Sequence, residues 1–346
     1  MKAIKQALGA VDTFQQRHRA AGFVYAVQKK YGDDNAGALV AQLTYTMFVT
    51  IFPLLLLLIT ILGLVLAGDP SARARITASA FGEFPIVGHQ LAGNIHALKR
   101  GSLIGLIIGI VGLIYGSTSL AQTGLSAMSQ VWNVPFVKQP NFLAGLARSL
   151  LFLVVLALEL VVTTVLSGFG TFGRHNIALG VLAELFAGLA NVAFYIGTFR
   201  VLTPKQVAIR TLLPGAIVGG VFFTILQAVG GYVVGHDLKG ASATYGLFGV
   251  VLGLIAWLYL GARATLYAAE VSTVLHHHLW PRALVQPPLT DADERAMRLQ
   301  VLALQRRPEQ QIVLGFTAAG EPTKMADAEV PDPGPPAAEG AKVGHQ

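Results

Sequence analysis

Six long apolar runs alternate with polar and charged connections along the chain. Each run has about 20 residues or more, the length that an α-helix needs to cross the hydrocarbon core of a bilayer. The runs lie at about residues 39–67, 103–123, 148–170, 178–199, 212–235 and 246–270. Pro53 interrupts the first run and is expected to kink that helix. The pattern predicts an all-α, polytopic membrane protein, a bundle of six transmembrane helices.

The segments outside these runs have a different composition. Residues 1–34 form a basic amphipathic pattern, typical of a helix that lies on lipid headgroups. Residues 281–310 contain a second amphipathic helix, expected in the cytoplasm. Residues 311–346 are rich in Pro, Gly, Ala and Glu and are expected to be disordered. A transmembrane domain over residues 35–280 therefore stands between two polar ends.

Lysine and arginine gather in the segments that would face one side of the membrane. They include Lys29, Lys30 and Arg282, and because positive charge marks the cytoplasmic side, both termini are expected there. Asp33 and Asp34 precede the first long run and offer N-caps for its helix. Either Thr290 or Asp291 is expected to cap the helix after the last span.

Composition supports a membrane protein and excludes several chemistries. The 346 residues are 53% hydrophobic and only 12% charged, with mean hydropathy +0.59, whereas soluble domains carry about 25% charged residues. The chain has no cysteine, which excludes disulfides, thiol catalysis and Cys-ligated metals. The net charge of +7 is explained by membrane topology and anionic headgroups. We expect membrane lipids as partners, leave a homo-oligomer open, and expect neither nucleic acid nor a cofactor.

Small residues recur at four-residue spacing inside the predicted spans. "GAIVG" places Gly215 and Gly219 on one helix face, and "GVVLG" repeats this spacing at Gly249 and Gly253. In lipid, such faces let helix backbones approach closely. We expect tight packing within the bundle; the alternative is that these smooth faces slide during transport.

Three ionisable residues inside the spans are the main candidates for a site: Glu159, Arg263 and Glu270. Glu159 lies near the centre of the third span, where a lone carboxylate costs about 3 kcal/mol or more. Arg263 lies about 10 Å deeper than Glu270, too far for a direct pair. A pair between Glu159 and Arg263 inside the bundle is one hypothesis. The other is that Arg263 reaches toward the interface, Glu159 is protonated or hydrogen-bonded, and Glu270 reaches water.

Uncharged polar residues accompany these charges within the spans. Gln42, Tyr45, Gln227 and Tyr259 are candidates to line a polar cavity, although each alone is more often an interhelical hydrogen bond. The run His276–His278 is not expected to bind a metal, since consecutive helical residues point in different directions. No HExxH or GxSxG motif and no cluster of carboxylates typical of nucleases occurs, so no catalytic site is expected.

Several short motifs, in order and at characteristic spacing, resemble the YihY/BrkB proteins of bacterial inner membranes. They are Tyr45 with Phe52–Pro53, "VWNV" at 131–134, Arg148, "LPGA" at 213–216, "YG" at 245–246 and "WLYLGA…AAE" at 257–270. The likeness covers about residues 20–280. One departure is "YAAE" at 267–270, where the family commonly has "FGAE". The resemblance implies a six-helix inner-membrane protein with both termini inside.

The resemblance implies less about activity. Members of this family have been linked to virulence and serum resistance, and some carried a ribonuclease BN-like label that these residues do not support. The sequence favours transport of an ion, small solute or lipid through a polar cavity. A non-catalytic protein that organises the cell envelope is the alternative. An enzyme acting on lipid-linked substrates would need a second acidic or His group beside Glu159, which the sequence does not place.

Overall fold

The computed structural model describes residues 2–65, 103–172, 177–203, 207–236, 238–312 and 314–316. The chain divides into two compact units, Met1–Ile312 and Val313–Gln346. The tail expected to be disordered, residues 311–346, lies almost wholly outside the described residues. The helices of the described residues all belong to the first unit.

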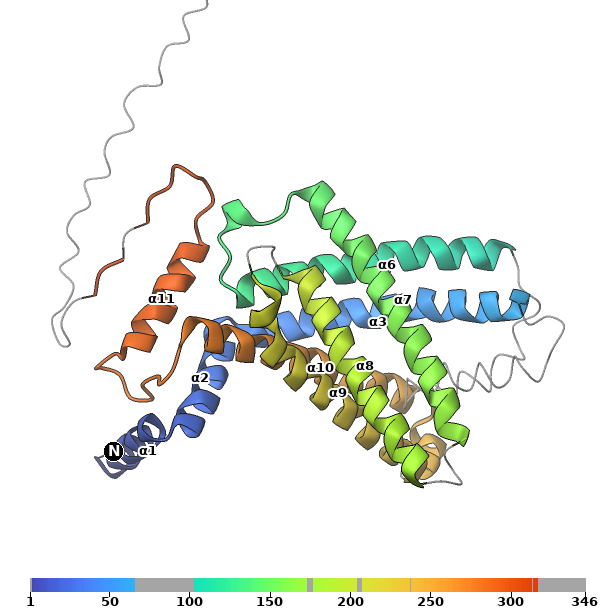
Figure 1. Cartoon of the computed structure of the whole chain (residues 1–346), viewed down its shortest axis with the longest axis horizontal. Coiled ribbons are helices and arrows are strands. Elements are labelled where there is room, and N and C mark those ends of the chain that lie inside the picture. Colours follow the sequence, from blue (N-terminus) through green and yellow to red (C-terminus); the bar gives the residue numbers. More distant parts are fainter. Residues whose placement is uncertain are drawn as a thin grey trace, which may run out of the picture. The chain divides into compact units, whose positions relative to one another are not determined.

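The described part of the first unit is built from helices and contains no strand, which confirms the all-α prediction (Figure 1). The helices are α1 (Lys2–Arg17), α2 (Arg19–Asp33), α3 (Ala36–Val65), α6 (Leu103–Val131), the 3₁₀ turn η2 (Phe136–Lys138), α7 (Phe142–Phe172), α8 (Ile177–Leu202), α9 (Ile209–His236), α10 (Leu238–His277) and α11 (Asp291–Ala303).

Six of these helices are long and apolar enough to cross a membrane, as the hydrophobic pattern predicts. The candidate spans are Ala36–Pro53, Ile107–Val131, Leu143–Thr163, Glu184–Leu202, Ile209–Gly230 and Val251–His277. At 1.5 Å per residue, the 40 residues of α10 extend about 60 Å, twice the ~30 Å hydrocarbon core. Part of α10 therefore stands outside the core of the bilayer. The side on which the termini lie stays a prediction.

Neighbouring helices along the chain pack side by side. Helix α3 packs along α6, α7 along α8, α8 along α9 and α9 along α10, and α10 also contacts α3 (Figure 1). The main hydrophobic core joins the N-terminal parts of α3 and α9 to the C-terminal parts of α6, α8 and α10, for example at Val40, Leu212, Met128, Phe199 and Leu266. These ends therefore meet at one end of the bundle.

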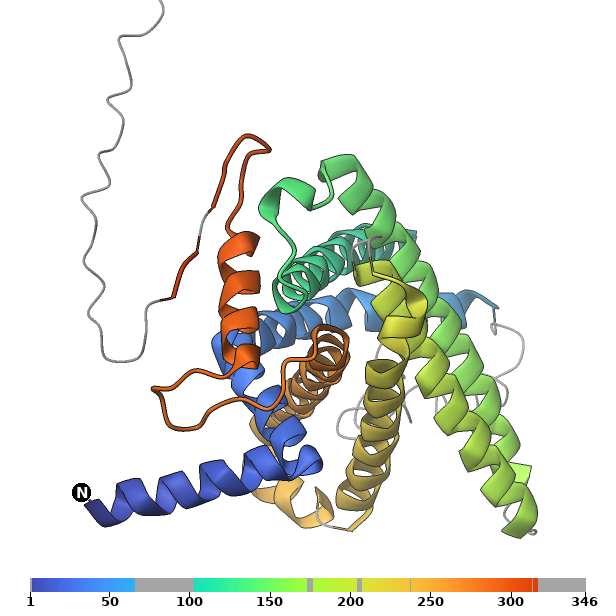
Figure 2. The same cartoon turned by 60° about the vertical axis from the view of Figure 1, so that its left-hand side comes forward.

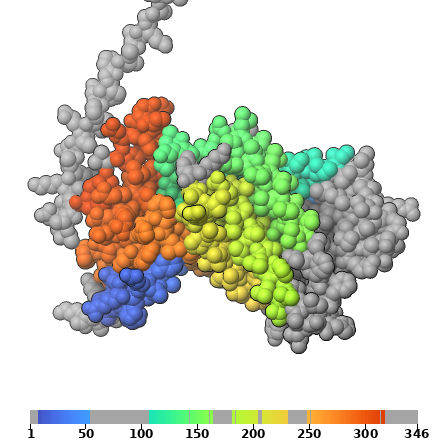
Figure 3. All heavy atoms as spheres, in the orientation of Figure 1, coloured from blue at the N-terminus to red at the C-terminus, as the bar shows by residue number. Residues whose placement is uncertain are grey.

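The end where these helices meet carries a separate group of elements, which we call the cap: residues 2–34 and 278–303. Helix α2 packs on α10, and a smaller apolar cluster joins Ala26 and Val27 of α2 to Val274, Leu279 and Ala296. Helix α1 projects from α2 (Figure 2), and the blue and orange atoms of the cap gather at one end of the unit (Figure 3). Burial of α2 residues means that this helix does not simply lie on headgroups; for α1 that placement stays a prediction.

Glycine allows close contact between α9 and its neighbours, as the spacing predicts. A Cβ atom on Gly215 would lie 2.2 Å from the Ala268 carbonyl oxygen of α10. A Cβ on Gly219 would lie 2.5 Å from the ring of Tyr195 on α8. Both distances are shorter than van der Waals contact. Pro53 lies inside α3, facing Gly112 of α6, and the expected kink there stays a prediction.

We predict that Gly215→Ala destabilises the protein by about 1–3 kcal/mol, because the methyl group must displace backbone of α10. Thermal unfolding in detergent micelles measures this as a lowered Tm. Gly37→Ala in α3 is the matched control, since nothing lies within 4 Å of its Cβ position and alanine favours helix. Equal Tm values for the two variants would contradict close packing at Gly215.

Candidate functional site: buried ion pairs and a groove on α6

A lysine of α2 lies completely buried where four elements meet. Lys30 is 0% exposed, and its Nζ donates hydrogen bonds to the Asp34 carboxylate and, at 3.0 Å, to the Val131 carbonyl at the end of α6. It also lies 3.7 Å from Oε2 of Glu270 on α10, an ion-pair distance too long for a hydrogen bond. Gln130 of α6 donates to the Asp34 carbonyl at 2.6 Å. One ammonium thus joins α2, the connection between α2 and α3, α6 and α10.

The partners of Lys30 are buried as deeply as Lys30 itself. Glu270 is 0% exposed, and neither of its carboxylate oxygens accepts a hydrogen bond from the described residues. Removing charges from water costs several kcal/mol per ion, which only a close counter-charge repays. Glu270 therefore depends on Lys30, and the position of α2 on α10 depends on this contact.

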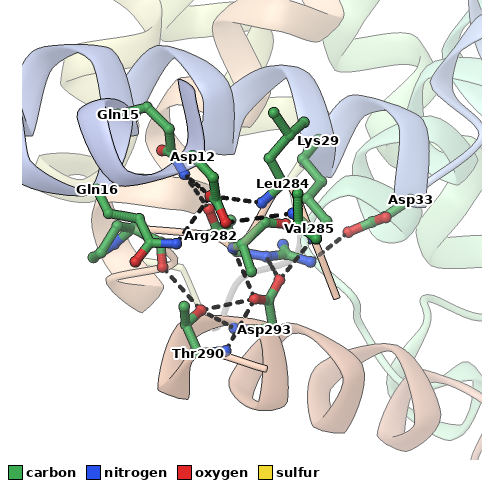
Figure 4. Close-up of polar contacts among 12 residues, drawn as sticks. Asp12, Gln15, Gln16, Lys29, Asp33, Arg282, Leu284, Val285, Thr290 and Asp293 are labelled. Carbon is green, nitrogen blue, oxygen red and sulfur yellow. Dashed lines mark hydrogen bonds and ion pairs between the residues drawn. The ribbon is translucent and has the colours of Figure 1, made fainter. Parts of the chain in front are cut away.

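A second charged cluster, around Arg282, joins the two segments of the cap, residues 2–34 and 278–303, which are far apart along the chain (Figure 4). The buried guanidinium donates from Nε to Asp293 Oδ1 at 2.6 Å and from Nη2 to Asp33 Oδ2 at 2.8 Å. Lys29 Nζ adds a hydrogen bond to Asp293 Oδ1 at 2.9 Å. Thr290 caps α11 by a reciprocal capping box with Asp293, which confirms one of the two expected caps.

Asp12 connects α1 to the same cluster (Figure 4). Its Oδ1 accepts hydrogen bonds from the Leu284 backbone N–H and from Gln15 Nε2, both at 2.9 Å. Gln15 Nε2 in turn donates to the Arg282 carbonyl at 2.6 Å. Burial alone would raise the pKa of Asp12, but these hydrogen bonds outweigh it and lower the pKa below its ordinary value.

The carboxylate of Asp293 accepts hydrogen bonds from several residues of the cap. Burial alone would raise the pKa of its carboxyl, yet donors from Lys29, the Ala283 N–H, Arg282 and Thr290 hold the pKa well below the ordinary 3.8. A carboxylate with a depressed folded-state pKa contributes stability that is present above its unfolded pKa. That contribution is lost only as pH falls below about 3.8 toward the lowered value.

Polar side chains inside the bundle mostly bind one another across helices. Asn191 of α8 donates to Thr224 Oγ1 at 2.9 Å and to Gln227 Oε1 at 3.1 Å, both on α9. The hydroxyl of Tyr195 on α8 lies 2.9 Å from Thr265 Oγ1 on α10. These contacts are interhelical hydrogen bonds of the kind that stabilise membrane bundles.

A groove of about 530 Å³ lies along one face of α6 within its membrane-spanning part. The described residues that line it are Val111, Ile114, Tyr115, Thr118, Ser119 and Gln122. Their spacing of three and four places them on one side of the helix. Two apolar side chains stand at one end of this face, and hydroxyl and amide groups follow them toward the other end.

A family model described as "Virulence factor BrkB" matches residues 27–290, well over half of the chain. The chain belongs to the virulence factor BrkB family. The match includes Lys30, Glu270 and Arg282, together with all six candidate spans. The family resemblance inferred from the motifs is thereby confirmed, and the chain is an integral membrane protein of the BrkB family.

Curated relatives include two that are named as membrane proteins and one that is named as ribonuclease-like. The BrkB-family chain is 23% identical over 254 residues to a ribonuclease-like protein YfkH of Bacillus subtilis, covering 68% of the chain and 88% of YfkH. It is 24% identical over 271 residues to a UPF0761 membrane protein of Pseudomonas aeruginosa, covering 75% of the chain and 64% of that protein. It is 23% identical over 292 residues to the inner membrane protein YhjD of Escherichia coli, covering 77% and 85%. No solved structure matches.

The structure does not join the two charges predicted to pair. The ion pairs between described residues involve Lys29, Lys30 and Arg282, and none links Glu159 to Arg263. Arg263 is exposed, with its guanidinium carbon 5.7 Å from the ring centre of Tyr267. Glu159 is half-buried on α7, where its backbone carbonyl accepts a hydrogen bond from Thr163.

The other predicted site residues of the BrkB protein lie in different surroundings. The expectation that Glu270 reaches water is wrong, because α2 covers it and places Lys30 beside it. Gln42 and Tyr45 are exposed on α3, the latter by 69%, and are not among the described residues of the α6 groove. Gln227 binds Asn191, and Tyr259 is 37% exposed on α10.

Sequence reasoning misses the residues that organise the BrkB cap. From the sequence, we interpret the charges of Lys29, Lys30 and Arg282 only as indicators of membrane orientation. We interpret Asp33 and Asp34 only as helix caps. The structure pairs the two aspartates with Arg282 and Lys30 instead. One signal is present: Asp33 and Asp34 follow Lys29 and Lys30 at helical spacing. Among the residues described, no group of three or more His, Cys, Asp or Glu is placed to hold a metal ion.

We predict that Lys30→Met destabilises the protein by about 3–5 kcal/mol, because Asp34 and Glu270 lose their positive partner while staying buried. Thermal unfolding of the purified protein measures the loss. Arg19→Met, an exposed position on the same helix, is the control and should leave Tm unchanged. The double variant Lys30→Met/Glu270→Gln should recover part of the loss. A Lys30→Met protein as stable as Arg19→Met would refute the role of this pair.

We predict that Asp293→Asn releases α11 from the cap, since the buried Arg282 and the partly buried Lys29 keep their charges without that carboxylate. Hydrogen exchange of α11 amides should accelerate about tenfold or more at pH 7. In the wild-type protein the same amides should stay protected down to about pH 4 and lose protection only below it. Asp291→Asn, exposed in the same helical turn, is the control; equal exchange in both variants would exclude this anchoring role.

Proposed function

We propose that this BrkB-family protein transports a small amphipathic molecule across the bacterial inner membrane, using the α6 groove as its binding site. Transport of an ion, a small solute or a lipid is the class that the sequence favours, and the groove narrows that class. The observation that carries the proposal is an open groove of about 530 Å³ on one face of α6, within a candidate membrane span, whose described lining has both apolar and polar side chains.

The lining supports an amphipathic ligand for a physical reason. Binding sites for small molecules typically have volumes of about 300–1,000 Å³ and combine apolar walls with a few polar groups. Val111 and Ile114 offer apolar contact, while Thr118, Ser119 and Gln122 offer hydrogen bonds that lipid tails cannot use. Polar side chains that line a groove within a membrane span are suited to bind the polar part of a molecule that crosses the membrane.

The remaining architecture supports movement around a fixed end. The cap and the buried Lys30 contact hold α2, the connection from α2 to α3, and one end each of α6 and α10 together. The opposite part of α6, where the groove lies, is outside this clamp. We infer that the bundle opens and closes around the groove while the capped end stays joined, with the cap on the cytoplasmic side.

A second candidate function is the organisation of envelope components without transport. The apolar side chains of Leu8, Val11 and Phe14 on α1 favour it, because they are exposed. Such a face suits the headgroup layer or a partner helix. The names of the Pseudomonas and Escherichia relatives are those of membrane proteins and fit either function.

The test of transport is flux through proteoliposomes containing the purified protein. A panel of fluorescent amphipathic probes is loaded, and release is compared for wild type, Ser119→Leu and Ser126→Leu. Ser119 lines the groove, whereas Ser126 is exposed on the same helix outside it, so the two variants make the same chemical change. We expect Ser119→Leu to lower flux of the transported probe about tenfold by filling the groove and removing a hydroxyl, with Ser126→Leu unchanged.

Two outcomes would contradict the proposal. If wild-type vesicles release every probe at the rate of protein-free vesicles, the groove does not transport such molecules, and the envelope-organising function is favoured. If Ser119→Leu and Ser126→Leu release the probe equally, transport does not use the α6 groove. Insertion and Tm are compared first, so that a loss of flux reports on transport.

A further inference from the structure

One face of α10 is exposed along its membrane-spanning part and ends at an arginine. Leu252, Ala256, Leu260 and Arg263 are positioned at spacings of four, four and three residues, and Leu252, Leu260 and Arg263 are exposed. Such spacing places them on a single helix face, with Tyr259 beside them. An apolar stripe in the span Val251–His277 thus leads to one positive charge.

The surroundings of Arg263 are aromatic rather than acidic. Its guanidinium carbon lies 5.7 Å from the ring centre of Tyr267, and no carboxylate of the described residues pairs with it. Tyr267 stacks on Tyr31 of α2, with ring centres 4.2 Å apart and planes 8° apart. The Tyr267 hydroxyl also donates to Gln28 at 2.6 Å. The cap therefore fixes the ring on which the guanidinium rests.

An exposed arginine inside a membrane span needs an anion or a route to water, because an isolated charge in hydrocarbon is costly. The planar guanidinium matches a phosphate group through two parallel hydrogen bonds. Tyrosine and arginine both suit the depth of lipid headgroups. The residues at this place fit the phosphate of a phospholipid better than they fit an internal carboxylate.

The length of the apolar stripe agrees with one leaflet of a bilayer. From Leu252 to Arg263 the helix advances by about 16 Å at 1.5 Å per residue. Half of the hydrocarbon core measures about 15 Å. A lipid whose phosphate meets Arg263 would therefore have room for its acyl chains along Leu260 and Ala256, toward Leu252.

We propose that Arg263, together with the Tyr259 hydroxyl, binds the phosphate of an anionic phospholipid whose acyl chains lie along Leu252, Ala256 and Leu260. The lipid is anionic because Arg263 supplies a positive charge with which no carboxylate of the described residues pairs. The site shares no residue with the α6 groove, so it goes beyond the transport function and does not depend on it.

The test is lipid retention by the full-length protein, measured by native mass spectrometry in detergent. Phosphatidylglycerol and phosphatidylcholine of identical acyl chains are titrated separately. We expect wild type to retain phosphatidylglycerol in preference, and Arg263→Gln to weaken that binding about tenfold or more. Arg263→Lys should recover part of the affinity, since it keeps the charge without the planar fork. Tyr259→Phe should weaken binding by about two- to fivefold.

Arg210→Gln provides the matched control, because Arg210 is an exposed arginine at the start of α9. Its phosphatidylglycerol binding should equal that of wild type, and the Tm of each variant is measured to confirm folding. The proposal is overturned if Arg263→Gln retains phosphatidylglycerol as wild type does, or if phosphatidylcholine binds equally well. It is also overturned if inorganic phosphate at millimolar concentration displaces the lipid, since the site would then recognise a free anion. Because this experiment measures no flux, a negative result would contradict the lipid site alone and would not bear on transport through the α6 groove.

Discussion

The buried ammonium of Lys30 is the contact on which the arrangement of this protein depends. Among the described residues it lies where α2, the connection from α2 to α3, α6 and α10 meet, and it donates hydrogen bonds to Asp34 and to the Val131 carbonyl. A hydrophobic side chain there would pack, but it would leave Asp34 and Glu270 without compensation. The ion pair therefore specifies which helix ends meet, and the apolar core that surrounds it provides the bulk of the cohesion.

The ion pairs and hydrogen bonds of the cap hold the polar segments at the two ends of the first unit in place as well. Arg282 and Asp293 bring the segment after α10 back onto α2, and Asp12 attaches α1 to the same segment. The cap in turn positions Tyr31, which stacks on Tyr267 and so fixes the aromatic surface beside Arg263. A chain of fixed contacts thus leads from the polar ends to a charge inside a membrane span, while the groove on α6 lies on another helix.

The hydrophobic pattern predicts the six spans, the helix after residue 290 and the close contacts at Gly215 and Gly219, because each follows from local periodicity and side-chain size. The charged contacts of the cap follow from tertiary proximity instead. Lys30 and Glu270 are far apart along the chain, and the sequence does not show that α2 folds back over α10. The hypothesis of a pair between Glu159 and Arg263 rested on depth alone, and similar depth in a bilayer does not place two side chains on facing helix surfaces; Arg263 is exposed, and no ion pair between these two described residues is present.

The separation of these partners along the chain has a consequence for biosynthesis. Asp12 binds the backbone N–H of Leu284, 272 positions later, and Lys30 cannot meet Glu270 until α10 has been made. A ribosome adding about 5–20 residues per second needs roughly 15–50 seconds to make that interval. Throughout this time Asp12 and Lys30 lack the partners that the later part of the chain supplies, and all six apolar segments must leave the translocon before the polar ends can close on each other. Closure of the cap is therefore the last step of assembly, and it takes place only after every span has been made.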